Sequence, residues 1–241
     1  RQMCIRDRCI LFGEHAVVYG QPALACSISQ RMTIELEVEE TFEKWRLDGR
    51  TFNPKKHPHI DYLRNQLPPM EEQPIHIRIR GSIPKASGLG SSAALSVALC
   101  GALQQLRGED LNAMQASELS HRAEANAQGG RASPMDTATS SFGGFVVLSD
   151  TIEGDLEYLG VRTMDVEGTT LQWHLHTFNA EIPEGVALVI GNTGVHGSTS
   201  AMVKQVADLL LENPQRSVEL ETIGAIARRG IQACLLYTSD A

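Results

Sequence analysis

Residues 84–94 read Pro84-Lys85-Ala86-Ser87-Gly88-Leu89-Gly90-Ser91-Ser92-Ala93-Ala94, a loop of small residues that runs into an apolar stretch. Gly88 and Gly90 allow the backbone to adopt positive φ angles and to approach a ligand closely. The helix that we expect to open at Ser91 presents unpaired N–H groups at the positive end of its dipole. Together these features predict a cradle for an anion, most usefully for a triphosphate.

The hydroxyls at the start of this helix add a second kind of chemistry. Ser91 and Ser92 can cap the helix, bind phosphate or ligate Mg²⁺. The segment is neither a Gly-x-x-x-x-Gly-Lys-[Ser/Thr] loop nor a Rossmann Gly-x-Gly-x-x-Gly loop. Taken alone, its spacing also fits a Gly-rich turn into a capped helix, and that alternative stays open here.

The hydrophobic pattern on both sides of the loop predicts a mixture of strands and helices. Strands are expected over residues 33–39, 75–79 and 145–148, at a buried run over 186–190, and as two short strands within residues 9–19. Helices are expected over residues 60–66, 91–106, 110–128, 200–211 and 217–229, with Asp110 as an N-cap. Because this order lacks a regular β-α-β alternation, the expected class is α+β with an antiparallel-rich sheet.

The composition excludes several classes of protein. The 21 basic and 29 acidic residues give a formal net charge of -8 without a basic patch, so nucleic acid is not an expected partner. The five cysteines are odd in number and form no Cys-x-x-Cys pair, which argues against a disulfide framework or a zinc knuckle. No apolar run reaches about 18 residues, and the N-terminus lacks the apolar stretch of a signal peptide. We therefore expect a cytoplasmic protein that has no membrane span.

Four carboxylate- or donor-rich sites outside the loop are candidates for function. Asp136 lies among small hydroxyl residues, where it could act as a general base or hold a substrate hydroxyl; an N-cap is the alternative. The Glu14-His15 pair lies between two apolar runs and is costly to bury without partners. It therefore either lies at a strand turn that faces a cleft or forms an exposed turn. Residues 191–199 form a donor-rich loop for which a surface loop is an equal alternative. From spacing alone, Glu124 reads as part of a solvated helix face.

Four segments in this order resemble the GHMP kinases, in the form found in the mevalonate kinase branch. Residues 12–20, Phe-Gly-Glu-His-Ala-Val-Val-Tyr-Gly, look like the first motif of that family, and residues 88–94 match the second. Residues 133–137 look like the catalytic-aspartate segment of archaeal-like mevalonate kinases. The resemblance implies the family's two-domain α+β fold. An N-terminal ATP-binding domain, ribosomal-protein-S5-domain-2-like, would cover residues 1–165, and a partial C-terminal α/β-sandwich domain would cover residues 166–241.

The resemblance also implies an activity, the ATP-dependent phosphorylation of the 5-hydroxyl of mevalonate with Mg²⁺. Asp136 would accept or orient the proton of the attacking hydroxyl, and Ser92 and Glu124 would hold Mg²⁺ between the β- and γ-phosphates. Glu124 fits only if the Gly129-Gly130 stretch carries one extra residue relative to the family. The residues that would hold ATP are Pro84, Lys85, Ser87, Gly88, Leu89, Gly90, Ser91, Ser92 and Ala93. The mevalonate side would include Glu14, His15, Thr137 and Thr199, and a homodimer would be compatible with the family.

Two departures from the family pattern stand at the ends of the chain. The family has a Lys ahead of its first motif that helps to activate the hydroxyl; Arg8 takes this catalytic position, although Arg is permanently charged and planar. The family's third, Gly-rich motif is not found before Ala241. Residues 1–8 and 235–241 do not read like the family. We expect them to be translated adapter or cloning sequence joined to a gene fragment, which would make this chain an incomplete enzyme.

Other functions stay open at this point. Homoserine kinase, galactokinase and phosphomevalonate kinase share the superfamily motifs, whereas Glu14-His15 together with residues 133–136 favours mevalonate kinase. A catalytically silent nucleotide-binding relative is the alternative from another class, and the replaced Lys is its only support.

Overall fold

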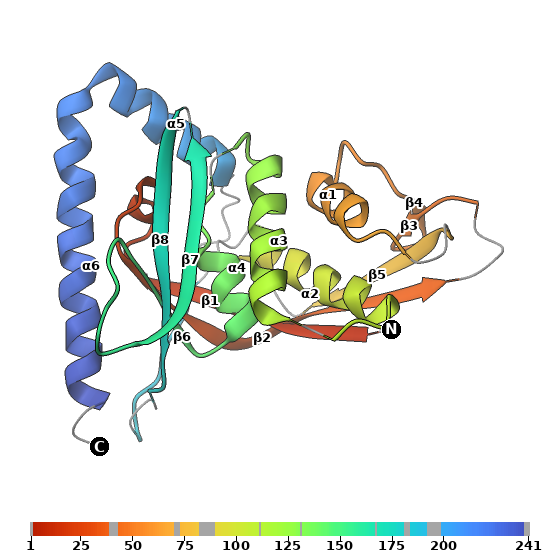
Figure 1. The fold of residues 1–241 in the computed structure, drawn as a ribbon, viewed down its shortest axis with the longest axis horizontal. Helices are drawn as coiled ribbons and strands as arrows, with labels where there is room; N and C mark the ends of the chain where they lie inside the picture. Colours follow the sequence, from red (N-terminus) through yellow and green to blue (C-terminus); the bar gives the residue numbers. More distant parts are fainter. Residues whose placement is uncertain are drawn as a thin grey trace.

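The computed structural model describes residues 2–38, 43–69, 73–81, 90–110, 112–130, 132–166, 168–180, 184–191 and 199–238; for residues 199, 200 and 236–238 it describes the backbone alone. Its centre is an eight-stranded sheet in which β1 pairs with β2 and the other strands follow the order β4-β3-β5-β2-β6-β8-β7 (Figure 1). The strands are β1 (Gln2–Phe12), β2 (Ala23–Val38), β3 (Arg46–Leu47), β4 (Arg50–Thr51), β5 (Ile75–Gly81), β6 (Phe145–Ser149), β7 (Glu157–Val166) and β8 (Thr169–Phe178). Every pairing except that of β3 with β5 is antiparallel, which confirms the α+β class.

Six α-helices and two short 3₁₀ helices accompany the sheet in the described part of the chain. They are η1 (Ala16–Tyr19), α1 (Pro58–Gln66), α2 (Ser91–Leu106), α3 (Ala113–Ala127), α4 (Met135–Phe142), α5 (Thr199–Glu212), η2 (Pro214–Arg216) and α6 (Ser217–Thr238). α2 and α4 pack on β1 and β2, α3 packs on α2 and α4, and α1 packs on α3 (Figure 1). None of these helices is both long and apolar enough to cross a bilayer.

Alternation along the central strands decides which helix covers which face. Ala25 and Val146 share a core with Met135 of α4. Their neighbours Leu24 and Val147 point to the opposite face, because successive side chains of a strand alternate, and share a core with Ile231 of α6. The sheet is therefore covered by α4 on one face and by α6 on the other.

A further core fixes α2 over the other end of β2. Its strand side is made by Ile34, Leu36, Ile75 and Ile77, and its helix side by Leu99 and Leu103. α2 itself is rich in fully buried alanines such as Ala93, Ala94 and Ala98, which lets the helix lie close to the sheet. These contacts confirm the strand predicted at residues 33–39 as far as Val38, residue 39 lying outside the described residues, the strand at 75–79 and the helix over 91–106.

Two local predictions near the ends of elements are wrong. Residues 9–19 contain one strand, not two, because the chain turns at Gly13 (φ +83°) and continues as η1. A Cβ on Gly13 would lie 2.2 Å from the carbonyl oxygen of Pro22, so no other residue fits this turn. The N-cap of α3 is Asn112, whose side chain accepts a hydrogen bond from the N–H of Gln115 at 3.0 Å, and not Asp110.

The region after β6 differs most from the sequence prediction. The predicted buried strand over residues 186–190 is wrong: these residues pair with no strand in the described part of the chain, and Val189 is 86% exposed. The hairpin of β7 and β8, which the sequence pattern did not predict, continues the sheet from β6. The expected domain boundary at residues 165/166 falls at the tip of this hairpin, so the two-domain division stays a prediction. α6 extends to Thr238, beyond the predicted end at residue 229.

A buried histidine ties α3 to the connection that leads into α4. His121 is 2% exposed, and its Nε2 lies 3.0 Å from the carbonyl oxygen of Ala132. Its ring meets Trp173 edge-on at 6.0 Å. Burial lowers the pKa of His121 to about 4, so the ring is neutral at pH 7 and Nε2–H can donate to that carbonyl.

This histidine predicts a loss of stability in mild acid. Between pH 6.5 and about 4 the unfolded His121 takes up a proton and the folded one does not, so the free energy of unfolding falls as the pH falls. We expect the contribution of His121 to lower the free energy of unfolding by roughly 2–3 kcal/mol between pH 7 and pH 4.5. Urea unfolding at both pH values measures it: His121→Gln should remove this part of the pH dependence, and His174→Gln on β8 should keep it. Equal pH dependence in wild type and His121→Gln would contradict the assignment.

Candidate active site

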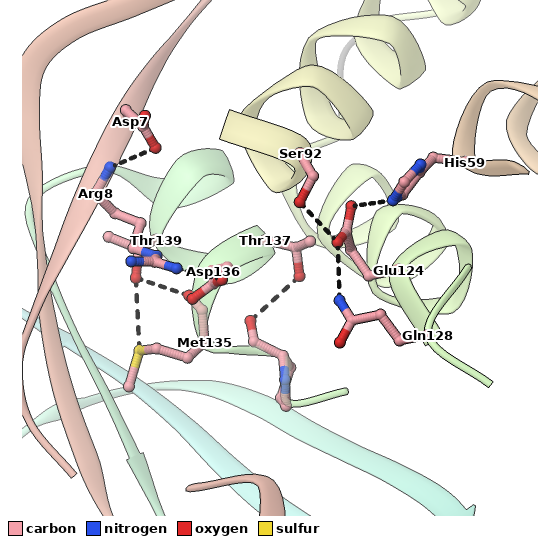
Figure 2. Close-up of polar contacts among 11 residues, drawn as sticks. Asp7, Arg8, His59, Ser92, Glu124, Gln128, Met135, Asp136, Thr137 and Thr139 are labelled. Carbon is pink, nitrogen blue, oxygen red and sulfur yellow. Dashed lines mark hydrogen bonds and ion pairs between the residues drawn. The ribbon is translucent and has the colours of Figure 1, made fainter. Parts of the chain in front are cut away.

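β1 brings a buried cation to the first turn of α4. Arg8 is 6% exposed, and its Nη2 donates to Oδ2 of Asp136 at 2.5 Å (Figure 2). Asp136 is the second residue of α4 and its side chain stays 31% exposed. The predicted catalytic residues Arg8 and Asp136 therefore meet, although 128 positions separate them in the sequence.

The same guanidinium lies against the beginning of α2. Gly90 is the N-cap of α2 with φ +84°, and a Cβ at this position would lie 2.8 Å from Nε of Arg8. Glycine is therefore required at position 90 for two reasons: the backbone has a positive φ, and Arg8 leaves no room for a Cβ. The helix that follows includes Ser91, Ser92 and Ala93, as predicted. The remaining predicted nucleotide-binding residues, Pro84, Lys85, Ser87, Gly88 and Leu89, lie outside the described residues.

Three carboxylates surround Arg8. Asp7 is fully buried, and burial raises its pKa to about 6 even though its Oδ1 accepts the N–H of Arg8 at 2.9 Å. Burial also raises the pKa of Glu14, against the attraction of Arg8, and the nearby Asp136 charge raises it further. Glu14 thus lies within electrostatic reach of the predicted catalytic pair, in a turn where His15 adopts φ 68° and its ring packs 5.8 Å from that of Tyr19.

A second cluster forms where α2 faces α3. Glu124 is only 4% exposed, so it does not belong to a solvated helix face. Ser92 donates to its Oε2 at 2.9 Å, and Gln128 donates to the same oxygen at 3.2 Å. Ser96 donates to Oε1 at 3.0 Å. Nε2 of His59, from α1, lies 3.6 Å from Oε1; Figure 2 shows His59, Ser92 and Gln128 around Glu124.

This cluster suits a hard cation at the beginning of α2. A serine hydroxyl and a carboxylate oxygen, 2.9 Å apart, are the oxygen donors that Mg²⁺ prefers. Mg²⁺ sites commonly take one or two protein oxygens and complete their shell with water and substrate phosphates. Ser92 and Glu124 therefore fit the predicted metal site.

The other predicted substrate residues have different surroundings. Thr137 is fully buried, and its Oγ1 donates to the carbonyl oxygen of Pro134 at 3.2 Å, which fixes the first turn of α4. Thr199 opens α5, but its side chain lies outside the described residues. Substrate contacts of Thr137 and Thr199 stay predictions.

Sequence reasoning missed three residues of the Glu124 cluster. Ser96 and Gln128 follow Ser92 and Glu124 by one helical turn each, and that spacing places them on the same helix faces. This i, i+4 relation was a usable signal for both residues. No such signal exists for His59 in the sequence, because only the packing of α1 on α3 brings that residue to the cluster.

A cleft of about 650 Å³ opens beside this cluster, between the end of α3, Tyr19 and α5. Gln128 lines it and also holds Glu124, so the cleft adjoins the candidate metal site. From α5 it receives apolar side chains and the Lys204–Asp208 ion pair, 2.8 Å long. The cleft has room for a small-molecule ligand.

Comparison with known proteins identifies relatives of this chain. The family model described as GHMP kinases N terminal domain matches residues 57–144, which contain Ser92, Glu124 and Asp136. The mevalonate kinase of Methanothermobacter thermautotrophicus is 38% identical over 172 residues, which cover 68% of this chain and 56% of that protein. The mevalonate kinase of Pyrococcus furiosus is 29% identical over 245 residues, which cover 91% of this chain and 66% of that protein.

A solved structure shows the same fold over nearly the whole chain. The Methanococcus jannaschii mevalonate kinase superposes with a TM-score of 0.63 at 20% identity, covering 96% of this chain and 72% of that one. This chain thus spans 56% to 66% of the length of the two curated relatives named above. The matched family model and the archaeal relatives lead to one conclusion: the chain belongs to the GHMP kinase family.

Proposed function

We propose that this chain carries the ATP-binding and catalytic half of a mevalonate kinase, which phosphorylates the 5-hydroxyl of mevalonate. The observation that carries the proposal is the Arg8–Asp136 pair, 2.5 Å long, placed against Gly90 at the beginning of α2. A base, a cation and a helix N-terminus then converge, which is what phosphoryl transfer from a nucleotide requires. The mevalonate kinases among the relatives support the choice of substrate.

In the proposed reaction the 5-oxygen of mevalonate attacks the γ-phosphorus of ATP, and the bond from that phosphorus to the β,γ-bridging oxygen breaks. Asp136 accepts or orients the proton of the attacking hydroxyl, and the cation at position 8, Arg in this sequence and Lys in the family pattern, holds the carboxylate in place. The N–H groups at the start of α2 stabilise phosphate charge. Mg²⁺ bound by Ser92 and Glu124 would neutralise charge on the β- and γ-phosphates. Such catalysis depends mainly on positioning and charge neutralisation.

The substrate side of the proposal rests on the turn after β1. Glu14 lies within electrostatic reach of Arg8 and Asp136, and His15 precedes η1, which leads to Tyr19 in the wall of the cleft. Glu14 and His15 would therefore contact the acceptor while Asp136 faces its hydroxyl. We propose Thr199, at the beginning of α5, as a further residue near the transferred phosphoryl group.

Acceptor specificity tests the proposed function. The gene's complete product, whether or not it extends beyond these 241 residues, is assayed for ADP release with mevalonate, homoserine, galactose and phosphomevalonate. We expect kcat/KM for mevalonate to exceed the others by about 100-fold or more, because a site built to hydrogen-bond one acceptor rejects the rest. Turnover of another acceptor would assign a different kinase of the family. Nucleotide binding without any turnover would identify a silent relative.

Removal of the proposed base tests the role of Asp136. Asp136→Asn keeps the size of the side chain and removes its ability to accept the proton, so kcat should fall about 10²- to 10⁴-fold. Binding of ATP, measured by calorimetry, should stay within a few-fold of wild type. Asp150→Asn is the matched control, since Asp150 pairs with Arg228 of α6 away from this site. A kcat within threefold of wild type for Asp136→Asn would rule out the proposed role.

A further inference from the structure

A third hydroxyl lies directly behind the Ser92–Glu124 pair. Ser96 is fully buried and follows Ser92 by one turn of α2. Its Oγ lies 3.0 Å from the carbonyl oxygen of Ser92 and 3.0 Å from Oε1 of Glu124. A bond from a serine to the carbonyl one turn earlier is common in helices, but here the same hydroxyl also reaches a buried carboxylate on another helix. The hydroxyl has one proton, and of its two acceptors the charged carboxylate is the stronger one.

The four neighbours of Glu124 divide its two oxygens between them. Oε2 accepts from Ser92 and Gln128, at 2.9 and 3.2 Å. Oε1 accepts from Ser96, while His59 lies 3.6 Å away on the same side, beyond hydrogen-bond distance. Among the described residues Ser96 is therefore the donor within hydrogen-bond distance of Oε1, and together with the donors to Oε2 it fixes the rotation of the carboxylate about its last bond. Removing such a donor destabilises the ionised form of a carboxylate that is only 4% exposed, because water cannot easily replace the lost hydrogen bond.

The direction of these bonds matters for a cation. Ser92 uses its single proton for Oε2 of Glu124, so the lone pairs of its oxygen stay available to a metal ion. This arrangement holds only while Oε2 is turned toward Ser92, and the bond from Ser96 to Oε1 keeps it there. We propose that Ser96 is a positioning residue, which orients Glu124 so that Ser92 and Glu124 together receive the Mg²⁺ of a nucleotide. This inference rests on the proposed function, because it takes Ser92 and Glu124 as the metal ligands.

α3 supplies a matched control for the packing of a buried serine. Ser120 is fully buried like Ser96, and its hydroxyl finds no hydrogen-bond partner in the described part of the chain. Ser120→Ala therefore removes a buried hydroxyl that orients no carboxylate. If Ser96 only filled space, Ser96→Ala and Ser120→Ala would have the same effect.

Manganese binding tests the inference without using turnover. Mn²⁺ is titrated into this chain with a non-hydrolysable ATP analogue, and free Mn²⁺ is followed by electron paramagnetic resonance. Ser96→Ala should weaken Mn²⁺ binding about 10- to 100-fold, the usual effect of removing an outer-shell partner of a metal ligand. Ser120→Ala should bind Mn²⁺ as wild type does, and Ser96→Thr, which keeps the hydroxyl, should recover much of the affinity. Binding of the analogue without metal should change little.

The outcomes separate this inference from the proposed function. If Glu124→Gln weakens Mn²⁺ binding and Ser96→Ala binds within twofold of wild type, the role of Ser96 is overturned and the proposed function stands. If wild type does not bind Mn²⁺ with the analogue, or Glu124→Gln binds it normally, the proposed metal site fails and the role of Ser96 fails with it. Thermal unfolding checks each variant. Should Ser96→Ala not fold, Ser96→Cys keeps the volume with a weaker donor and should show the same loss.

Discussion

The rest of the site depends on one buried ion pair, Arg8 with Asp136. A guanidinium that is 6% exposed is costly unless a carboxylate pairs with it, so β1 and α4 are held in one relative position. The register of β1 against β2 shifts between Arg6 and Arg8: only Asp7 lies between them on β1, whereas three residues, 28–30, lie between their partners Ser27 and Arg31 on β2. Such an irregularity redirects a side chain, and here it accompanies the turn of Arg8 toward the helices. The close contact of Arg8 with Gly90 then places the beginning of α2 beside the same charges.

Three acids around one cation, of which Asp7 is buried while Glu14 and Asp136 keep contact with solvent, leave an excess of negative charge. Burial raises the pKa of Asp7 to about 6 and also raises that of Glu14, so both carboxyls are easier to protonate than in water. A phosphate that approaches Asp136 meets this field as well as Arg8. The N-termini of α2 and α4, which carry partial positive charge, offset it, and a cation held by Ser92 and Glu124 would offset it further. Under the proposed function the two clusters would therefore act as one electrostatic arrangement.

Sequence reasoning predicted the residues that lie in motifs and missed those that only packing brings together. Gly90, Ser92 and Asp136 could be identified because small residues, hydroxyls and a carboxylate stand at fixed spacings in one segment each. His59 lies on a separate helix, and no local pattern connects it with Glu124. The apolar run at 186–190 resembled a buried strand, but a strand needs a partner ladder, and a run of hydrophobic residues does not show whether one exists. The hairpin of β7 and β8 was missed although β8 alternates Leu171, Trp173 and Leu175 with polar residues, which was a usable signal. On β7 the signal is weaker, since Gly160 marks an irregularity in the register.

The Glu124 cluster shows how two pairs of residues with i, i+4 spacing, one on each of two packed helices, form a site. Ser92 and Ser96 are four residues apart on α2, and Glu124 and Gln128 are four apart on α3, so each pair lies on one helix face. Where the two faces meet, three of these residues donate to the fourth, and the buried carboxylate is satisfied. A shift of one residue in either helix would turn one pair by about 100° and leave the carboxylate without its two serine donors. The register of α2 against α3 is thus fixed by the same contacts that prepare Ser92 and Glu124 for a cation, so packing and function constrain these helices together.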